Sequence, residues 1–172
     1  MRWEEIDNVP CSVARSLSVI GDRWTLLIIR DCFYGTSRFD DFQKQIGMTR
    51  HILSDRLRKL VDADILVKHA YQDCPTRFDY FLTPRGEDLY PILMTIAGWG
   101  DKWMSSSEGV PVEYVHATCG QVTMAGVVCS ECGEELTAET VKAQRGPGFP
   151  PARKPTNYAR YIHQLETLVL SE

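Results

Sequence analysis

Residues 39–82, FDDFQKQIGMTRHILSDRLRKLVDADILVKHAYQDCPTRFDYFL, contain the periodicity that decides the fold of this chain. Apolar residues recur at helical spacing through residues 39–46, with Ser37 placed as a cap and Gly47 as a terminator. Thr49 is then placed to cap a second helix that runs to about residue 63. The spacing therefore predicts two short helices separated by a tight turn.

The hydrophobic period changes after Asp64, from that of a helix to that of a strand. Residues 66–71 and 77–82 are predicted to be two short strands around the loop QDCPT, and RFDYFLT alternates cleanly. Thr83 and Pro84 then have the order of an N-cap and a first helical residue. We expect one long helix from there to about residue 105, bent at Pro91.

Two helices are predicted upstream of the central segment. Residues 12–19 form one, with Ser12 as a plausible cap, and the strongly apolar run WTLLIIRDCFY at residues 24–34 forms the next. The order of three helices, tight turn, helix, two-stranded hairpin and long helix is that of a winged helix-turn-helix. The predicted fold class is α+β and mainly α. A helix of this kind fits the DNA major groove, while the hairpin contacts the backbone or the minor groove.

Composition places the chain among ordinary globular proteins. It has 172 residues, of which 44% are hydrophobic and 24% charged, so global disorder is excluded. No apolar run approaches the ~20 residues of a membrane helix, and the first residues lack a secretory signal. We therefore expect a cytoplasmic protein without a membrane partner, whose six cysteines are reduced, metal-bound or redox-active rather than paired in structural disulfides.

Charge is unevenly distributed along the sequence. The net charge of -4 argues mildly against a nucleic-acid partner, but residues 38–77 carry eight basic and six acidic side chains. The predicted recognition helix and wing supply the candidate DNA contacts, which are Thr49, Arg50, His51, Ser54, Arg58, Lys68 and Arg77. The alternative reading of these residues is a charged face exposed only to solvent.

Four longer sequence motifs accompany this order of helices and strands. CSVARSLSVIGDRWTLLIIRDCFYGTSRFDDF, MTRHILSDRLRKLVDADIL, RFDYFLTPRGEDL and IAGWGDKW closely resemble the HxlR-type bacterial transcriptional regulators, over roughly residues 10–104. The resemblance implies a homodimer that binds a partly palindromic operator on double-stranded DNA and controls neighbouring genes. It leaves open a small-molecule effector that acts near the dimer helices.

Cys11 matches the cysteine with which the family pattern opens, and in some members that residue senses electrophiles or oxidants. A thiol at a helix N-terminus has a lowered pKa and more reactive thiolate. The predicted helix at residues 12–19 would supply such a terminus. The alternative is a small, half-buried residue without chemistry.

Beyond the triple serine at residues 105–107, the composition shifts toward Val, Gly and Cys. His116, Cys119, Cys129 and Cys132 form an H-x2-C-x9-C-x2-C array in which glycine follows each pair. Two such turns can supply four ligands to a closed structural zinc site. The alternatives are a metal-free hairpin with buried thiols, or a disulfide.

The sequence thus predicts three parts, with boundaries at residues 1–107, 108–145 and 146–172. The first is a winged helix-turn-helix for DNA binding and dimerisation, and the second a small, β-rich, zinc-ribbon-like appendage. The third is a Pro/Gly linker followed by a helix. We expect a regulator that is not an enzyme. The alternatives are a thiol-disulfide enzyme that uses the Cys-x-x-Cys pair, and a zinc-ribbon module that binds a protein partner.

Overall fold

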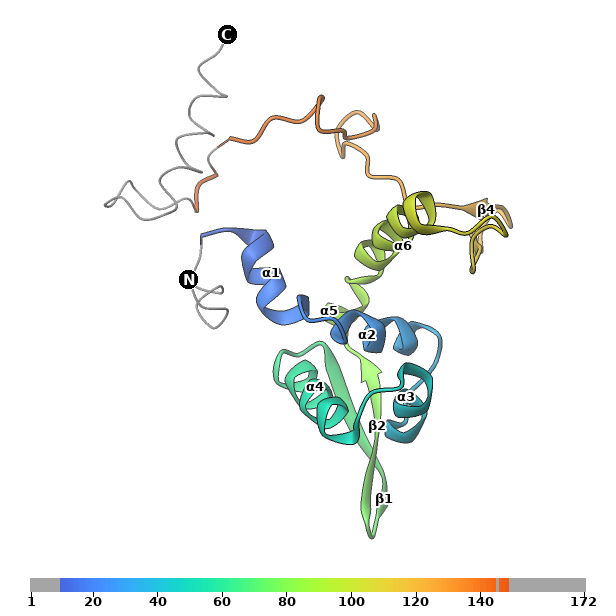
Figure 1. Ribbon diagram of the computed structural model, residues 1–172. Coiled ribbons are helices and arrows are strands. Elements are labelled where there is room, and N and C mark those ends of the chain that lie inside the picture. Colours follow the sequence, from blue (N-terminus) through green and yellow to red (C-terminus); the bar gives the residue numbers. More distant parts are fainter. Residues whose placement is uncertain (1–9, 145, 149–172) are drawn as a thin grey trace. The chain divides into compact units, whose positions relative to one another are not determined.

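The computed structural model describes residues 10–144 and 146–148 and shows a winged helix-turn-helix (Figure 1). Within the described residues no helix is both long and apolar enough to cross a membrane. The helices and strands follow in the order α1 Ser12–Ile20, α2 Thr25–Phe33, α3 Phe39–Ile46, α4 Arg50–Asp62, β1 Leu66–Asp73, β2 Thr76–Leu82, α5 Pro84–Glu87, α6 Tyr90–Met104, β3 Tyr114–Val115 and β4 Val122–Thr123.

The turn between α3 and α4 follows the sequence prediction closely. Gly47 ends α3 with a φ of 76°, in the left-handed region that glycine adopts without strain. Thr49 caps α4, and its side chain accepts a hydrogen bond from the backbone N–H of Ile52 at 3.5 Å. The short connection orients α4 across α3 and leaves one face of α4 directed outward.

Two other predicted caps are wrong. The N-cap position of α1 belongs to Cys11 rather than Ser12, and that of α3 to Arg38 rather than Ser37. The hydroxyl of Ser37 instead donates to Asp79 at 3.1 Å, across to the second strand. The hydroxyl of Ser37, which the local sequence pattern predicts to cap α3, therefore binds a residue that is distant in the sequence.

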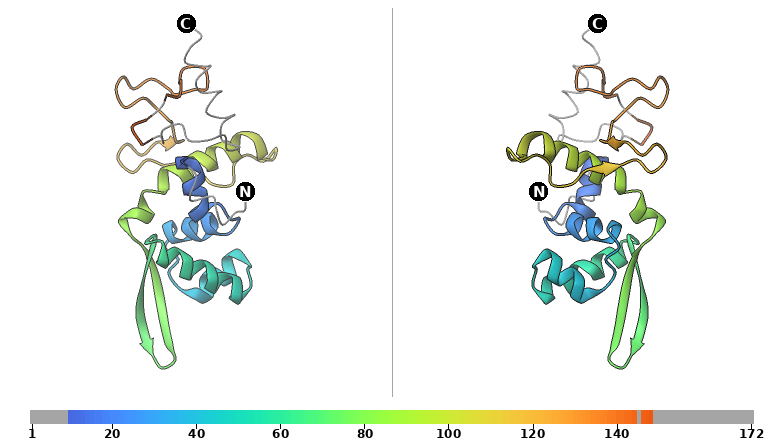
Figure 2. Two further views of the ribbon diagram at one scale, coloured as in Figure 1. Left: turned by 90° about the vertical axis from the view of Figure 1, so that its left-hand side faces the viewer. Right: turned by 90° about the vertical axis from the view of Figure 1, so that its right-hand side faces the viewer.

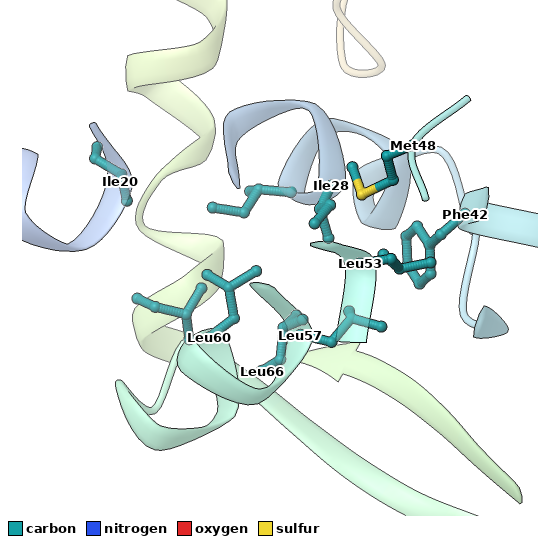
Figure 3. Close-up of a cluster of buried hydrophobic side chains, with 10 residues drawn as sticks. Ile20, Ile28, Phe42, Met48, Leu53, Leu57, Leu60 and Leu66 are labelled. Carbon is teal, nitrogen blue, oxygen red and sulfur yellow. The ribbon is translucent and has the colours of Figure 1, made fainter. Parts of the chain in front are cut away.

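The hydrophobic core lies between α2, α3, α4 and the base of the hairpin (Figure 3). Leu53, Leu57 and Leu60 form the buried stripe of α4. They meet Ile28 of α2 and Phe42 of α3, both fully buried. This core determines which residues of α4 face solvent. The buried leucines lie on one side of the helix, so the residues on the opposite side are exposed.

The hairpin of β1 and β2 is antiparallel, from the pair Leu66–Leu82 at its base to Asp73–Thr76 at its tip. A bulge between Ala70 and Gln72 shifts the register near the tip. Figure 2 shows the hairpin projecting past the helices, as a wing does. Only the base is buried, and the outer residues of β1 are exposed.

The predicted long helix is in fact two helices. Thr83 caps α5, accepting from the N–H of Gly86 at 3.2 Å, but α5 ends at Glu87 and α6 begins at Tyr90. Pro91 therefore occupies the first turn of α6, where its missing N–H costs no helical hydrogen bond. The proline marks a new helix start rather than a bend within one helix.

The chain divides into two compact units between Ala125 and Gly126. The end of the first unit carries the β3–β4 pair, and the second contains an isolated bridge between Val128 and Glu135. The boundaries predicted from composition stay predictions. The predicted C-terminal helix and most of its linker lie outside the described residues.

Candidate nucleic-acid interface

The outward face of α4 carries all five candidate contacts of the predicted recognition helix. Thr49, at the cap, is exposed, and so are the four residues that follow it on the same side of the helix, Arg50, His51, Ser54 and Arg58. Their exposure is a direct consequence of the buried leucine stripe on the opposite side. The face is accessible to a double helix over two turns.

Arg50 is held near the start of α4 by three neighbours from α3. Its Nη1 donates to Oδ1 of Asp40 at 2.8 Å and to Oε1 of Gln43 at 3.1 Å. Its guanidinium also lies 4.7 Å from the ring centroid of Phe39. The pair with Asp40 is exposed on both sides, so water and salt weaken it. These contacts thus orient Arg50, and another anion can replace Asp40 as the partner of its guanidinium.

Asp55 pairs with two basic residues of the following turn of the helix. Its carboxylate lies 2.6 Å from Arg58 Nη2 and 2.9 Å from Lys59 Nζ. The hydrogen bond from Lys59, followed by that from Arg58, lowers the pKa of Asp55 below its ordinary value. Arg58 is therefore exposed but already paired with a carboxylate that is 27% exposed.

Arg56 has a structural role. Its side chain is only 27% exposed, and Nη1 lies 3.2 Å from Oδ2 of Asp22, in the turn between α1 and α2. Asp22 also accepts from the backbone N–H groups of Trp24 at 2.9 Å and Thr25 at 3.2 Å. The carboxylate thus binds two backbone N–H groups at the start of α2 and ties this start to α4.

The wing contributes two of the predicted cations. Lys68 lies with Nζ 4.8 Å from the ring centroid of Phe78, which is two residues along β2 from Tyr80, the cross-strand partner of Lys68. Arg77 is exposed near the tip, and among the described residues no acidic side chain pairs with it. The guanidinium of Arg77 is therefore exposed to solvent, and no carboxylate of the described residues neutralises its charge.

Sequence reasoning missed Arg38. It lies 3.5 Å from Asp79 of β2 and stacks 4.8 Å from the ring centroid of Tyr71 in β1. No local pattern distinguishes Arg38, because its neighbours come from strands more than thirty residues away. Only the folding of the wing against α3 brings it to the same side as Arg50 and Arg77.

These residues line a groove of about 570 Å³ between α3, α4 and the wing. Its walls are formed by Arg38, Phe39, Asp40, Asp41, Arg50, Ser54, Tyr71, Pro75, Thr76, Arg77, Phe78 and Tyr80. Three arginines from three different elements thus meet two aspartates in one groove. Of the predicted contacts, Arg50, Ser54 and Arg77 come together there, while Thr49, His51, Arg58 and Lys68 are not among its lining residues.

The three cysteines of the winged helix differ in environment. Cys11, at the N-cap of α1, is partly buried, and its carbonyl accepts from the N–H of Arg15 at 3.0 Å. Burial, with the charge of Asp31 as a smaller cause, raises the pKa of Cys32 to about 12. Cys74 is exposed at the wing tip. Cys32 is thus a packing residue, as the apolar helix predicts.

The structure places the predicted metal ligands as two separate pairs. Nδ1 of His116 lies 3.3 Å from Sγ of Cys119, in the first compact unit. Cys129 and Cys132 lie in the second, where hydrogen bonds from the backbone N–H groups of Cys132 and Glu131 and from the Cys132 side chain lower the pKa of Cys129. In the described part of the chain, no three His, Cys, Asp or Glu side chains converge as a metal site would require.

One apolar surface remains uncovered in the first unit. None of the residues of α6 is buried, although most are hydrophobic. Ile96, Trp99 and Trp103 are 47%, 57% and 66% exposed, and Val13 of α1 is 67% exposed. Leu93 instead packs partly against the core.

Comparison with known proteins agrees with this architecture. The family model of the HxlR-like helix-turn-helix matches residues 19–108. An HTH-type transcriptional regulator of Mycobacterium tuberculosis, Rv3095, is 41% identical over 138 residues, which cover 80% of this chain and 87% of that protein.

Solved structures extend the likeness. PA1607, described as a transcription factor, superposes with a TM-score of 0.72 at 35% identity and covers 81% of this chain and 98% of its own. The redox regulator HypR in its reduced form superposes with a TM-score of 0.50 at 29% identity. That match covers 54% of this chain and 92% of HypR.

Proposed function

This chain belongs to the HxlR-like helix-turn-helix family of transcriptional regulators, and from that premise we propose that it binds a partly palindromic DNA operator as a homodimer. The observation that carries the proposal is the groove lined by three arginines, Arg38 just before α3, Arg50 of α4 and Arg77 of the wing. Regulators of this class are generally not enzymes, so the thiol-disulfide enzyme alternative is not favoured.

In this proposal α4 enters the major groove with its N-terminal half. Arg50 and Arg58 can each make bidentate hydrogen bonds to guanine, and Thr49, His51 and Ser54 lie on the same exposed face. Lys68 and Arg77 hold phosphates beside the wing and add affinity without reading sequence. Asp40 and Asp55 release their arginines when the more highly charged duplex arrives.

The homodimer is proposed from the uncovered apolar surface of α1 and α6. A helix with no buried residue among its hydrophobic positions gains stability when a second copy covers it. A two-fold axis there would set two copies of α4 on half-sites about one DNA turn apart. A change in the angle between protomers, from a small ligand near these helices, would then alter affinity.

The test uses an operator selected by the protein from a pool of random duplexes. Arg50→Ala and Arg58→Ala should each lose about 1–3 kcal/mol of binding free energy at a good base contact and accept more bases at one position of each half-site. Arg85→Ala removes an exposed arginine of α5 outside the groove and should bind as the wild type does. If both α4 variants bind with wild-type affinity and specificity, α4 is not the recognition helix.

A thiol switch at Cys11 is a second candidate, favoured by its place at the N-cap of α1 and by the similarity to the redox regulator HypR. A hydroperoxide would oxidise the Cys11 thiol to a sulfenic acid and be reduced to an alcohol or water. Peroxide should then lower operator affinity in the wild type and in Cys74→Ser, but not in Cys11→Ser. An equal response in Cys11→Ser would contradict this switch.

A further inference from the structure

The residues just before α3 are joined to the second strand of the wing. The backbone N–H of Tyr80 donates to the carbonyl of Ser37 at 2.9 Å, and Arg38 and Asp79 form an antiparallel bridge. The hydroxyl of Ser37 also donates to Oδ1 of Asp79 at 3.1 Å. The backbone at Arg38 is therefore fixed to β2 as well as to the start of α3.

Two contacts orient the side chain of Arg38. Its Nε lies 3.5 Å from Oδ1 of Asp79, and its Cζ lies 4.8 Å from the ring centroid of Tyr71. Neither contact uses Nη1 or Nη2, and the side chain of Arg38 is 59% exposed. Because the two Nη groups of a guanidinium form a planar fork, they can bind a phosphate with two parallel hydrogen bonds. Arg38 is thus held in place with this fork available to an anion.

The surroundings of Arg38 also favour an anion. It lines the groove between α3, α4 and the wing together with Arg50 and Arg77. Three arginines against two aspartates leave an excess of one positive charge on the walls of this groove. Of the two aspartates, Asp40 already pairs with Arg50 at 2.8 Å, and Asp41 is exposed to water that screens its charge.

A strand of the duplex is expected to run along this groove when DNA is bound. This step rests on the proposed function, in which α4 enters the major groove and the wing contacts the backbone or the minor groove. One sugar-phosphate strand separates a major groove from the adjacent minor groove. With α4 on one side of that strand and the wing on the other, its phosphates pass through the gap that Arg38 lines.

We propose that Arg38 binds a phosphate of this strand through Nη1 and Nη2. Asp79 and Tyr71 act as positioning residues, because they hold the guanidinium without occupying its fork. A phosphate contact carries no sequence information, so Arg38 adds affinity for every duplex alike. Since its backbone is bridged to β2, the contact also sets where the wing lies along the strand.

The first measurement compares Arg38→Gln with the wild type by fluorescence anisotropy across a salt series. The variant should bind both the selected operator and nonspecific duplexes about tenfold more weakly, with a slope of log affinity against log salt smaller by about one. Arg23→Gln removes an exposed arginine that stacks on Trp24 outside the groove and should retain the wild-type affinity and slope. Wild-type affinity and slope in Arg38→Gln would overturn the proposal.

The second measurement identifies the phosphate. Single methylphosphonates, which are neutral, replace the phosphates of the operator one at a time and should weaken wild-type binding at several positions. At one of these positions Arg38→Gln should lose no further affinity, whereas Arg77→Ala should still lose it. If Arg38→Gln remains sensitive at every position at which the wild type is sensitive, Arg38 only anchors the wing, and the proposal is wrong.

A third variant separates binding from folding. Arg38→Lys keeps a positive charge that can pair with Asp79 but lacks the planar fork, so its affinity should lie between those of the wild type and Arg38→Gln. Circular dichroism shows whether each variant folds as the wild type does. An Arg38→Lys variant that folds but binds no better than Arg38→Gln at any salt concentration would contradict a contact made through charge.

Failure of this inference and failure of the proposed function give different results. A wild type that selects no duplex would overturn both. A wild type that selects an operator and loses affinity on Arg50→Ala, but has no phosphate whose replacement is silent in Arg38→Gln, would overturn the contact of Arg38 alone.

Discussion

Arg50 illustrates how single residues set the charge of the groove between α3, α4 and the wing. Its guanidinium lies between Asp40, Gln43 and the ring of Phe39, all from the preceding helix. The acidic partner is 64% exposed and therefore weakens rather than abolishes the field of the arginine. Arg58 is also paired with an aspartate, Asp55, whose side chain is 27% exposed.

We predict that Asp40→Asn raises operator affinity by up to about fivefold, since an exposed pair contributes roughly 0.2–1 kcal/mol that DNA must otherwise replace. A mobility-shift titration at constant salt measures this. Asp88→Asn, an exposed carboxylate after α5, should leave affinity unchanged. Weaker binding of Asp40→Asn would mean that Asp40 positions Arg50 for its contact.

Arg77 should behave as a phosphate contact. Its replacement by alanine is expected to weaken specific and nonspecific duplexes by a similar factor and to reduce the slope of log affinity against log salt by about one. Fluorescence anisotropy across a salt series measures both quantities. A loss confined to the selected operator would instead assign a base contact to Arg77.

Cys32 and Cys74 should differ in reactivity. A thiol with a pKa of about 12 has roughly one thiolate in 10⁴ molecules at pH 8. We therefore expect iodoacetamide to modify the exposed Cys74 in the folded chain and to leave Cys32 unmodified until denaturant is added. Peptide mass spectrometry reads out both sites, and rapid labelling of Cys32 in native protein would contradict its burial.

At the scale of elements, contacts between helices decide how the recognition helix is held. Asp22 caps α2 through Trp24 and Thr25 and also pairs with Arg56 of α4. The Nε of Arg56 is buried and lacks a hydrogen-bond partner among the described residues. The carboxylate of Asp55 lies 4.0 Å from this Nε, so the pair with Asp22 at 3.2 Å is the shorter of the two ion pairs of Arg56. Asp22 therefore adds a polar link between α2 and α4 to the hydrophobic contacts of the core.

Asp22→Ala should lower the free energy of unfolding by about 2 kcal/mol, because the N–H groups of Trp24 and Thr25 lose their acceptor and Arg56 loses the nearer of its two carboxylates. Asp22→Asn keeps a capping oxygen and should lose less. Urea denaturation monitored by circular dichroism gives both values, with Asp88→Ala as the exposed control. A loss below about 0.5 kcal/mol in Asp22→Ala would remove Asp22 as the link between the helices.

On the scale of the whole molecule, the uncovered surface of α6 predicts assembly. Trp99→Glu places a charge in that surface and should shift the chain from a dimer to a monomer and weaken operator binding more than tenfold. Light scattering measures the mass, and Val67→Glu, an exposed apolar position of β1, serves as the control. A wild-type mass of one chain at micromolar concentration would contradict the dimer.

Local interactions made much of this protein predictable from sequence. The turn at Gly47, the caps at Thr49 and Thr83, and the hairpin of residues 66–82 depend on residues within a few positions of each other. Helical and strand periods separate the buried leucines of α4 from its exposed face, so the candidate contacts on that helix follow from the amino-acid pattern alone.

Only the tertiary structure decided the features that join distant segments. Four features have partners or causes outside the local sequence: the break between α5 and α6, the hydrogen bond from Ser37 to Asp79, the pairing of Arg56 with Asp22, and the place of Arg38 beside the wing. The periodicity of the sequence indicates which residues face the core. It does not indicate which side chains form hydrogen bonds or ion pairs with each other. Those contacts act over a few ångströms, so they depend on how the whole chain folds.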